Sequence, residues 1–478
     1  MRRTIPFLAA LLTLGLLFAC GGSMSPVRVT NGVPMTLTIG DTPPSGVAVL
    51  FFEASITGAT LQPSDSTKPA VSVLAAPVEV EFGHLQTDTA FLSLSNVTPD
   101  TYSSMNLTFG NAEMTIVNHS GAAIGSCANN TVCQLTPSFA TSTVTLSGTP
   151  FPVTIDMNSV VGIKLDLDVN SSVQNDLSIN PLVTIAHFRQ RQDDNEDQEM
   201  EELDELDGQV TAVGTNQFTL VNRSGQSFTV NVDSNTVFED FDRAGCTASP
   251  QDFSCVKMDQ IVEAELSESG MGTMLAKRVE FIEDASKEAI KGTITSVDSS
   301  GTQFQMVVFR EEPSVNGISE GQPVMVSIAS NATFQIGGEE MEENGGFSML
   351  GFSFASPADL MVGQDVQVRP AMVASSGGVV TVTTDLVRLW PSQITGQVGS
   401  IDSSSGTFTL TNLSPLFTGA TPPVNTINVV MLSNMNFEDS GNQPTLAVGN
   451  KVSVKGLLFN TPTTPTLVTR TIDDHQGN

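Results

Sequence analysis

Short runs of alternating apolar and polar residues recur along much of the chain. The clearest run is 163–169, in which apolar side chains at every second position flank Lys164, Asp166 and Asp168. Such alternation places one face of a β-strand in a core and the other in water. These runs predict one β-sandwich-like domain over residues 33–190, separated into strands by Gly, Pro and Asn. Earlier runs of similar character are 35–39, 47–56, 78–82, 90–94, 104–109 and 113–118.

After residue 206 a longer pattern occurs three times. Each copy opens on a Gly followed two positions later by Val or Ile, at Gly208, Gly292 and Gly396, and continues with an apolar strand that contains a Phe. The second and third copies later carry a Val-Gly-x-x-Val segment, which is degraded in the first. The spacing of the glycines is that of a domain and is too long for a solenoid repeat. With about five short strands per copy, the pattern predicts three small OB-like β-barrels. The expected barrel repeats cover 207–284, 290–390 and 394–474.

Two parts of the chain resemble families of unknown function. Segments 40–43 (Gly-Asp-Thr-Pro) and 97–102 (Val-Thr-Pro-Asp-Thr-Tyr) are similar to the domain-of-unknown-function 4382 family, although Asp100 stands where that family has Gly. This resemblance implies a transthyretin-like sandwich and no activity. The three repeats resemble the domain-of-unknown-function 5666 family. The expected fold class is therefore all-β, with a transthyretin-like sandwich followed by three OB-like barrel repeats.

The first twenty residues have the composition of an export signal. Arg2 and Arg3 precede an apolar run, 5–19, that is shorter than the about 20 residues of a spanning helix. The run ends on Ala-Cys20-Gly and looks like a bacterial lipobox. The resemblance implies a signal peptide over 1–19, acyl chains on Cys20, and a polar tether over 20–32. An ordinary signal peptide with Cys20 just past the cut is the alternative.

This lipobox-like export signal implies a lipoprotein of the bacterial cell envelope, held to the membrane by its acyl chains. Residue 21 is Gly rather than the Asp that often marks inner-membrane retention in lipoproteins, which favours the outer membrane. The protein would be periplasmic or surface-exposed there.

Charge excludes some partners. The 478 residues include 20 Lys and Arg against 51 Asp and Glu, a net charge of −31. Such a surface repels phosphate backbones, so nucleic acid is excluded as a partner. The densest acidic block, 191–206, separates two β regions and is interpreted as an acidic linker. Calcium binding there is the competing hypothesis, but the block lacks the Gly that bends an EF-hand loop. We expect no other cofactor or metal.

Four of the five cysteines form two local pairs, Cys127 with Cys133 and Cys246 with Cys255. Short separations in loop-like sequence of an exported chain predict two disulfides. Zinc is the alternative, but neither pair has the C-x2-C spacing and only four His are present.

No pattern of catalytic residues emerges. No G-x-S-x-G lies in a strand-to-helix context, and Asp166 and Asp168 share one strand face, as alternation alone predicts. Trp390 precedes a Pro at a repeat junction and is better explained by packing between domains than as a sugar platform. We therefore expect no enzyme.

The second repeat carries an apolar insertion, which is equally compatible with a partner-binding loop and with a hairpin packed on the barrel. Its apolar residues are Phe347, Met349, Leu350, Phe352 and Phe354. The expected function is a non-enzymatic, membrane-anchored extracytoplasmic scaffold or interaction module with an unknown envelope protein or glycan as partner. A cell-surface carbohydrate- or calcium-binding protein is the alternative.

Overall fold

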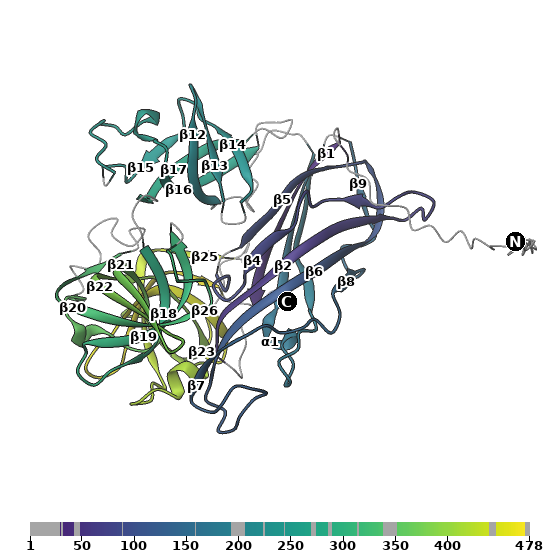
Figure 1. Cartoon of the computed structure of the whole chain (residues 1–478). Helices are drawn as coiled ribbons and strands as arrows, with labels where there is room; N and C mark the ends of the chain where they lie inside the picture. The colour runs from purple at the N-terminus through teal and green to yellow at the C-terminus, as the bar shows by residue number, and fades with distance from the viewer. Residues whose placement is uncertain are drawn as a thin grey trace, which may run out of the picture.

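The computed structural model is built almost entirely from β-strands. Figure 1 shows a two-sheet sandwich, a separate unit formed by residues 206–284, and two closed barrels that lie against each other. The all-β fold class is confirmed. The structure describes residues 29, 32–42, 48–87, 89–157, 159–192, 206–222, 225–242, 244–268, 274–284, 289–312, 315–337, 351–438 and 446–473.

One sheet of the sandwich has four strands in the order β11–β10–β1–β5. β1 runs parallel to β10 and antiparallel to β5. In β10, Ile163, Leu165 and Leu167 are buried, which confirms the alternation of the sequence. The strands are β1 (Val33–Thr42), β5 (Ala90–Val97), β10 (Ser159–Asp168) and β11 (Val183–Gln192).

Two long antiparallel strands dominate the other sheet, β2 (Ala48–Pro63) and β6 (Asp100–Asn118). Short strands pair along their outer edges: β3 and β4 with β2, and β7, β8 and β9 with β6. A single apolar core lies between the two sheets and draws residues from both. The short elements are β3 (Val71–Ser72), β4 (Val78–Glu81), β7 (Thr131–Leu135), β8 (Thr143–Leu146), β9 (Val153–Ile155) and the helix α1 (Val169–Ser172).

The second and third repeats fold as closed five-stranded barrels, here called barrel 2 and barrel 3. In each, the first strand pairs with the second and fourth, and the third runs parallel to the fifth. Barrel 2 comprises β18 (Ala289–Val297), β19 (Gln303–Glu312), β20 (Pro323–Ile336), β21 (Asp365–Ser376) and β22 (Val379–Trp390). Barrel 3 comprises β23 (Ser392–Asp402), β24 (Thr407–Thr411), the helix α3 (Pro415–Thr418), β25 (Ile427–Glu438), β26 (Lys451–Phe459) and β27 (Thr466–Asp473).

The first repeat, here called unit 1, is a six-stranded sheet with a related strand order. Two short strands, β14 and β15, occupy the place of the single long third strand, and both run parallel to β17. The parallel β14–β17 pairing corresponds to the pairing of the third and fifth strands in each closed barrel. Its strands are β12 (Leu206–Val213), β13 (Gln217–Val221), β14 (Ser227–Asn231), β15 (Val237–Glu239), β16 (Gln260–Glu268) and β17 (Met274–Asp284).

The opening glycine of each repeat has a steric cause. A Cβ on Gly208, Gly292 or Gly396 would stand 2.6, 2.5 or 3.0 Å from a carbonyl oxygen of the second strand. A side chain at Gly208 or Gly292 would therefore collide with the backbone of the second strand, and one at Gly396 would be tightly crowded by it.

A second landmark precedes the fourth strand. Gly363 and Gly449, the glycines of the Val-Gly-x-x-Val segments, have φ of 85° and 97°, and Asp259 at the same place in unit 1 has φ of 66°. Glycine adopts this left-handed conformation without steric cost, and Asp tolerates it better than most other residues. The turn geometry thus persists in the degraded first copy.

The sandwich packs on both closed barrels. An apolar cluster at this boundary contains Phe51 and Val117 of the sandwich, Val307 and Phe309 of barrel 2, and Leu416 of barrel 3. Nearby, the Thr115 hydroxyl donates a hydrogen bond of 2.5 Å to the Gly321 carbonyl of barrel 2. Because this cluster is buried, the three units form one packed body.

Unit 1 contacts the opposite sheet of the sandwich. The rings of Phe91 and Phe228 meet edge to face with centroids 5.0 Å apart, and the Gln226 amide donates to the Leu92 carbonyl at 2.6 Å. An ion pair of 3.0 Å between Asp207 of unit 1 and Arg310 links this unit to barrel 2.

Candidate functional site

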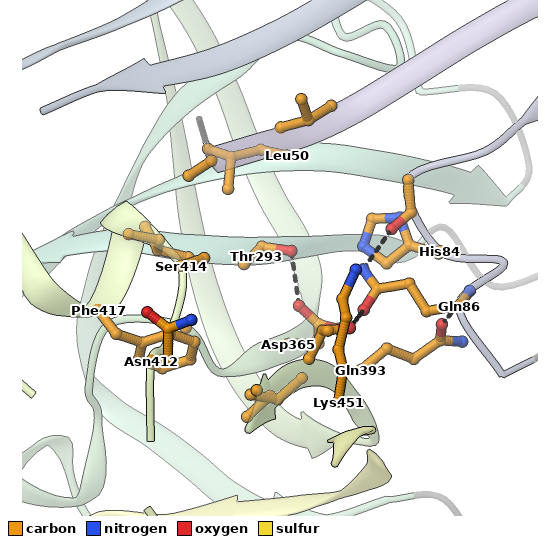
Figure 2. A pocket seen from close by; sticks show the side chains of 18 of the residues that line it. Leu50, His84, Gln86, Thr293, Asp365, Gln393, Asn412, Ser414, Phe417 and Lys451 are labelled. Carbon is orange, nitrogen blue, oxygen red and sulfur yellow. Dashed lines mark hydrogen bonds between the residues drawn. The ribbon is translucent and has the colours of Figure 1, made fainter. Parts of the chain in front are cut away.

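A pocket with a cavity volume of about 260 Å³ lies where the sandwich meets barrels 2 and 3. All three units contribute to its walls (Figure 2). Residues of the sandwich come from β2 and the 83–86 turn. Residues of the barrels come from their first and fourth strands, from Gly363 just before β21, and from segment 412–417 of barrel 3, which follows β24 and includes part of α3. Its polar lining residues are His84, Gln86, Thr293, Asp365, Gln393, Thr395, Gln397, Asn412, Ser414 and Lys451.

Equivalent positions of the two barrels face this pocket. Asp365 and Lys451 are the first residues of the fourth strands β21 and β26, and each follows a Val-Gly-x segment. Each pairs with the same position of its first strand, Asp365 with Thr293 and Lys451 with Gln397. The duplication thus brings a carboxylate and an ammonium group into one cavity.

Asp365 is the buried acid of the site. Its side chain accepts a hydrogen bond of 2.6 Å from the Thr293 hydroxyl, and its backbone N–H donates to Ser392 Oγ at 2.8 Å. Burial raises the pKa of Asp365 to about 6, while His84 and the Thr293 hydrogen bond act in the opposite direction. No described residue donates a hydrogen bond to the second carboxylate oxygen of Asp365.

The 83–86 turn of the sandwich supplies a hydrogen-bonded network on another wall. The Gln86 backbone N–H donates to Gln393 Oε1 at 2.9 Å, and the Thr395 hydroxyl donates to Gln86 Oε1 at 2.7 Å. The His84 ring lies 2.9 Å from Glu81 Oε2 through Nδ1 and 4.0 Å, between centroids, from the ring of Phe309. These contacts fix the turn against both barrels.

The remaining walls are apolar or carry polar groups with spare hydrogen-bonding capacity. Leu50, Leu416 and Phe417 are buried around the cavity. Among the described residues, the side chains of Asn412 and Ser414 have no hydrogen-bond partner. Figure 2 shows these two beside Phe417, across the cavity from Gln86 and His84.

Sequence reasoning missed this pocket. The Val-Gly-x-x-Val segments, which contain Asp365 and Lys451, relate the two repeats, but nothing in the sequence indicates which faces of the barrels meet. Gln86 and Gln393 are 307 positions apart and come together only through domain packing.

Several predicted site residues fall outside the described residues. These are Cys20, residues 193–205 of the acidic linker, Phe347, Met349 and Leu350. Among the described residues, no group of three or more His, Cys, Asp or Glu side chains could hold a metal ion. In the same part of the chain, no helix is long and apolar enough to cross a membrane.

The two described residues of the predicted partner loop pack on their own chain. The ring of Phe352 stacks on Phe459 of barrel 3 with centroids 5.0 Å apart. Phe354 is buried and meets Phe334 edge to face at 5.6 Å. For these two residues the structure supports the packing alternative, because Phe352 at the junction of the two barrels and Phe354 on barrel 2 both remove apolar surface from water.

Both predicted disulfides are present. Cys127 pairs with Cys133, and Cys246 pairs with Cys255, with Cα–Cα distances of 5.7 and 5.4 Å. Each closes a short loop. The zinc alternative is therefore excluded for these four residues.

Asp168, Trp390 and Asp100 have structural partners. Asp168 caps α1, accepting a hydrogen bond of 2.8 Å from the Ser171 backbone N–H. The Lys291 ammonium lies 3.9 Å from the centre of the Trp390 ring.

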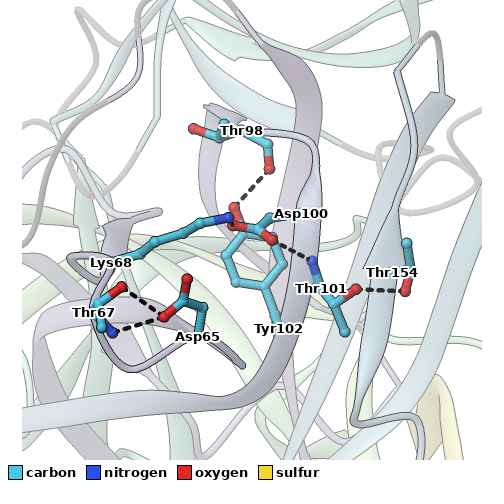
Figure 3. A network of polar contacts seen from close by, with 8 residues as sticks. All are labelled: Asp65, Thr67, Lys68, Thr98, Asp100, Thr101, Tyr102 and Thr154. Atoms are coloured by element: carbon cyan, nitrogen blue, oxygen red, sulfur yellow. Dashed lines mark hydrogen bonds and ion pairs between the residues drawn. The ribbon is translucent and has the colours of Figure 1, made fainter.

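Figure 3 shows Asp100 in the turn that resembles the first family. Its side chain pairs with Lys68 at 2.7 Å and accepts a bond from the Thr101 backbone N–H. Chiefly the hydrogen bond from Lys68 lowers the pKa of Asp100. The Tyr102 hydroxyl donates to the Thr98 carbonyl at 2.7 Å and ties the turn to the buried ring.

Comparison with known proteins supports the assignment of the repeats. Residues 207–280 and 395–461, in unit 1 and barrel 3, match the family described as "Domain of unknown function (DUF5666)". These segments cover less than half of the chain. No curated protein matches the sequence.

Proposed function

We propose that this protein is a non-enzymatic lipoprotein of the bacterial cell envelope whose folded part is a scaffold or interaction module. The observation that carries the scaffold role is the packing of three units into one body. Phe51, Val307 and Leu416, one from each unit, are at most 5% exposed at the common boundary. A body of this kind holds its outer surfaces at fixed positions, which is what a scaffold requires.

The lipid anchor is supported by the sequence of residues 1–21. A basic start, a short apolar run and Ala-Cys20-Gly fit acylation of Cys20. Because the net charge of −31 repels anionic headgroups, attachment must come from acyl chains rather than from a basic patch. We further propose that the protein is anchored in the outer membrane and that its partner is an envelope protein or a glycan.

The anchor is tested with labelled palmitate in a Gram-negative host. We expect label on the wild-type chain in the outer-membrane fraction and none on Cys20→Ala. Ser23→Ala, three positions further on, is the matched control and should keep the label. Equal labelling of wild type and Cys20→Ala would refute the anchor.

The scaffold role is tested by measuring one distance across the boundary. Spin labels at Thr141→Cys in the sandwich and Asn331→Cys in barrel 2 occupy exposed positions. One narrow distance distribution is expected, and Val307→Asp, which places a charge in the shared cluster, should broaden it. A broad distribution without Val307→Asp would show that the units move independently and would overturn the scaffold proposal.

A further inference from the structure

We propose that the pocket between the sandwich and barrels 2 and 3 binds a neutral, polyhydroxylated molecule of about monosaccharide size. Ligand sites prefer domain boundaries and combine apolar walls with a few convergent polar groups. This pocket has both features, and its about 260 Å³ lies just below the usual range of about 300–1,000 Å³ for ligand pockets. Its occupant is therefore small.

Unused hydrogen-bonding capacity points to a ligand. Asp365 is 3% exposed, yet only one of its carboxylate oxygens accepts a hydrogen bond from a described residue. The second oxygen is not one of the fully buried side-chain atoms that lack a partner, so it is open to the cavity, where a ligand hydroxyl can donate to it. Asn412 and Ser414 offer further donors and acceptors from barrel 3.

The balance of charge and polarity selects the class of ligand. The acid Asp365 and the base Lys451 face the same cavity, and the third titratable lining residue, His84, is paired with Glu81. Positive and negative groups therefore balance, and the site gives no net preference for an anion or a cation. Most other polar lining groups are amides and hydroxyls, which both donate and accept, as sugar hydroxyls do. Leu50 and Phe417 supply an apolar wall for the C–H face of a sugar ring.

The inference is independent of the proposed scaffold role. A scaffold without a sugar site, or a sugar site in a protein that scaffolds nothing, would each leave the other proposal standing.

The only tryptophan of the chain provides a reporter of binding. Trp390 is the direct cross-strand partner of Asp365 in the antiparallel β21–β22 pair, so both side chains project from the same face of the sheet. We would titrate the full chain with glucose, galactose, mannose and N-acetylglucosamine, following Trp390 fluorescence and saturation-transfer NMR. We expect saturable binding of at least one sugar with both signals.

Two variants and one control locate the site. Asp365→Asn should weaken binding at least tenfold. Asn412→Gly should weaken it several-fold, because it removes the exposed side chain and keeps the left-handed backbone that Asn412 adopts at φ 52°. Asn331→Ala changes an exposed asparagine on β20 that does not line the pocket, and this variant should bind as the wild type does. The proposal is overturned if none of the four sugars binds, if binding is unaffected by both pocket variants, or if glycine or acetate binds at Asp365 while sugars do not.

Discussion

Gly363 of barrel 2 lies against the aromatic ring of Phe417 of barrel 3. A Cβ on Gly363 would stand 2.2 Å from Phe417 Cε1, and the residue has φ of 85°. Two constraints therefore act on one position, a left-handed backbone and a close approach between two duplicated domains. Gly449 occupies the same position of barrel 3 with φ of 97°, but a Cβ there would meet nothing within 4 Å.

This pair of glycines separates backbone strain from domain packing. Gly363→Ala should destabilise the protein by about 2–5 kcal/mol, since the left-handed conformation costs about 1–2 kcal/mol and overpacking adds about 1–3 kcal/mol. Gly449→Ala should lose only the first contribution. Chemical denaturation of both variants measures the difference. Equal losses would mean that the Phe417 contact is not maintained in solution.

Asp365 should make stability depend on pH. Its pKa is raised from 3.8 to about 6 in the folded protein, so its contribution is most favourable below about pH 4 and is lost as the pH rises through about 6. Asp365→Asn removes this cost and should stabilise the protein by up to about 3 kcal/mol at pH 8, with little effect at pH 4. Thermal unfolding at the two pH values tests the sign. A stabilisation that is larger at pH 4 would contradict it.

Glu53 should add a second pH dependence at the boundary between the sandwich and barrel 2. Burial and four carboxylates, with Glu320 of barrel 2 as the strongest, raise its pKa to about 7. The other three, Glu79, Glu81 and Glu113, lie on the neighbouring strands β4 and β6. Stability should fall as the pH rises from about 4.5 through about 7.

The variant Glu53→Gln should remove this fall. Because Glu53 is partly exposed, solvent screening reduces the expected gain at pH 8 to about 1–2 kcal/mol. Asp156→Asn, an exposed acid on the same sandwich, is the control and should leave the pH profile unchanged. An unchanged profile for Glu53→Gln would show that Glu53 titrates normally.

Features that depend on neighbours in sequence could be predicted from the sequence. The alternation of apolar and polar residues predicted β10, because Ile163, Leu165 and Leu167 occupy every second position, as one face of a strand does. Local spacing located both disulfides, because six and nine residues close loops that two Cys side chains can bridge. The repeat pattern predicted the first strands, because a glycine such as Gly292 is required by the close approach of the second strand of the same barrel.

Features that depend on the docking of whole domains could not be predicted. The pocket requires Gln86 of the sandwich and Thr395 of barrel 3 to meet, and no local pattern encodes that distance. The same limit applies to Phe352. An apolar residue in a loop has the same sequence context whether it binds a partner or, as here, stacks on Phe459 of the next barrel.

Tyr102 should stabilise the sandwich through one hydrogen bond. Its ring is fully buried and its hydroxyl donates to the Thr98 carbonyl. Tyr102→Phe leaves that acceptor unpaired and should cost about 1–2 kcal/mol in urea unfolding. Lys68→Ala, which breaks only the exposed pair with Asp100, is the control and should have no measurable effect. A larger loss for Lys68→Ala than for Tyr102→Phe would show that the ion pair, and not the tyrosine, stabilises the turn.

The two disulfides should stabilise their units by similar amounts. In the chain-entropy account, loops this short gain about 2–3 kcal/mol each from cross-linking of the unfolded chain. The double variants Cys127→Ser with Cys133→Ser and Cys246→Ser with Cys255→Ser should each lose about that much in denaturant unfolding. Because the first pair lies in the sandwich and the second in unit 1, hydrogen exchange should show each loss in its own unit. Peptide mapping of oxidised wild-type protein without reductant is the control. Crossed pairing, or free thiols at these four positions, would contradict the assignment.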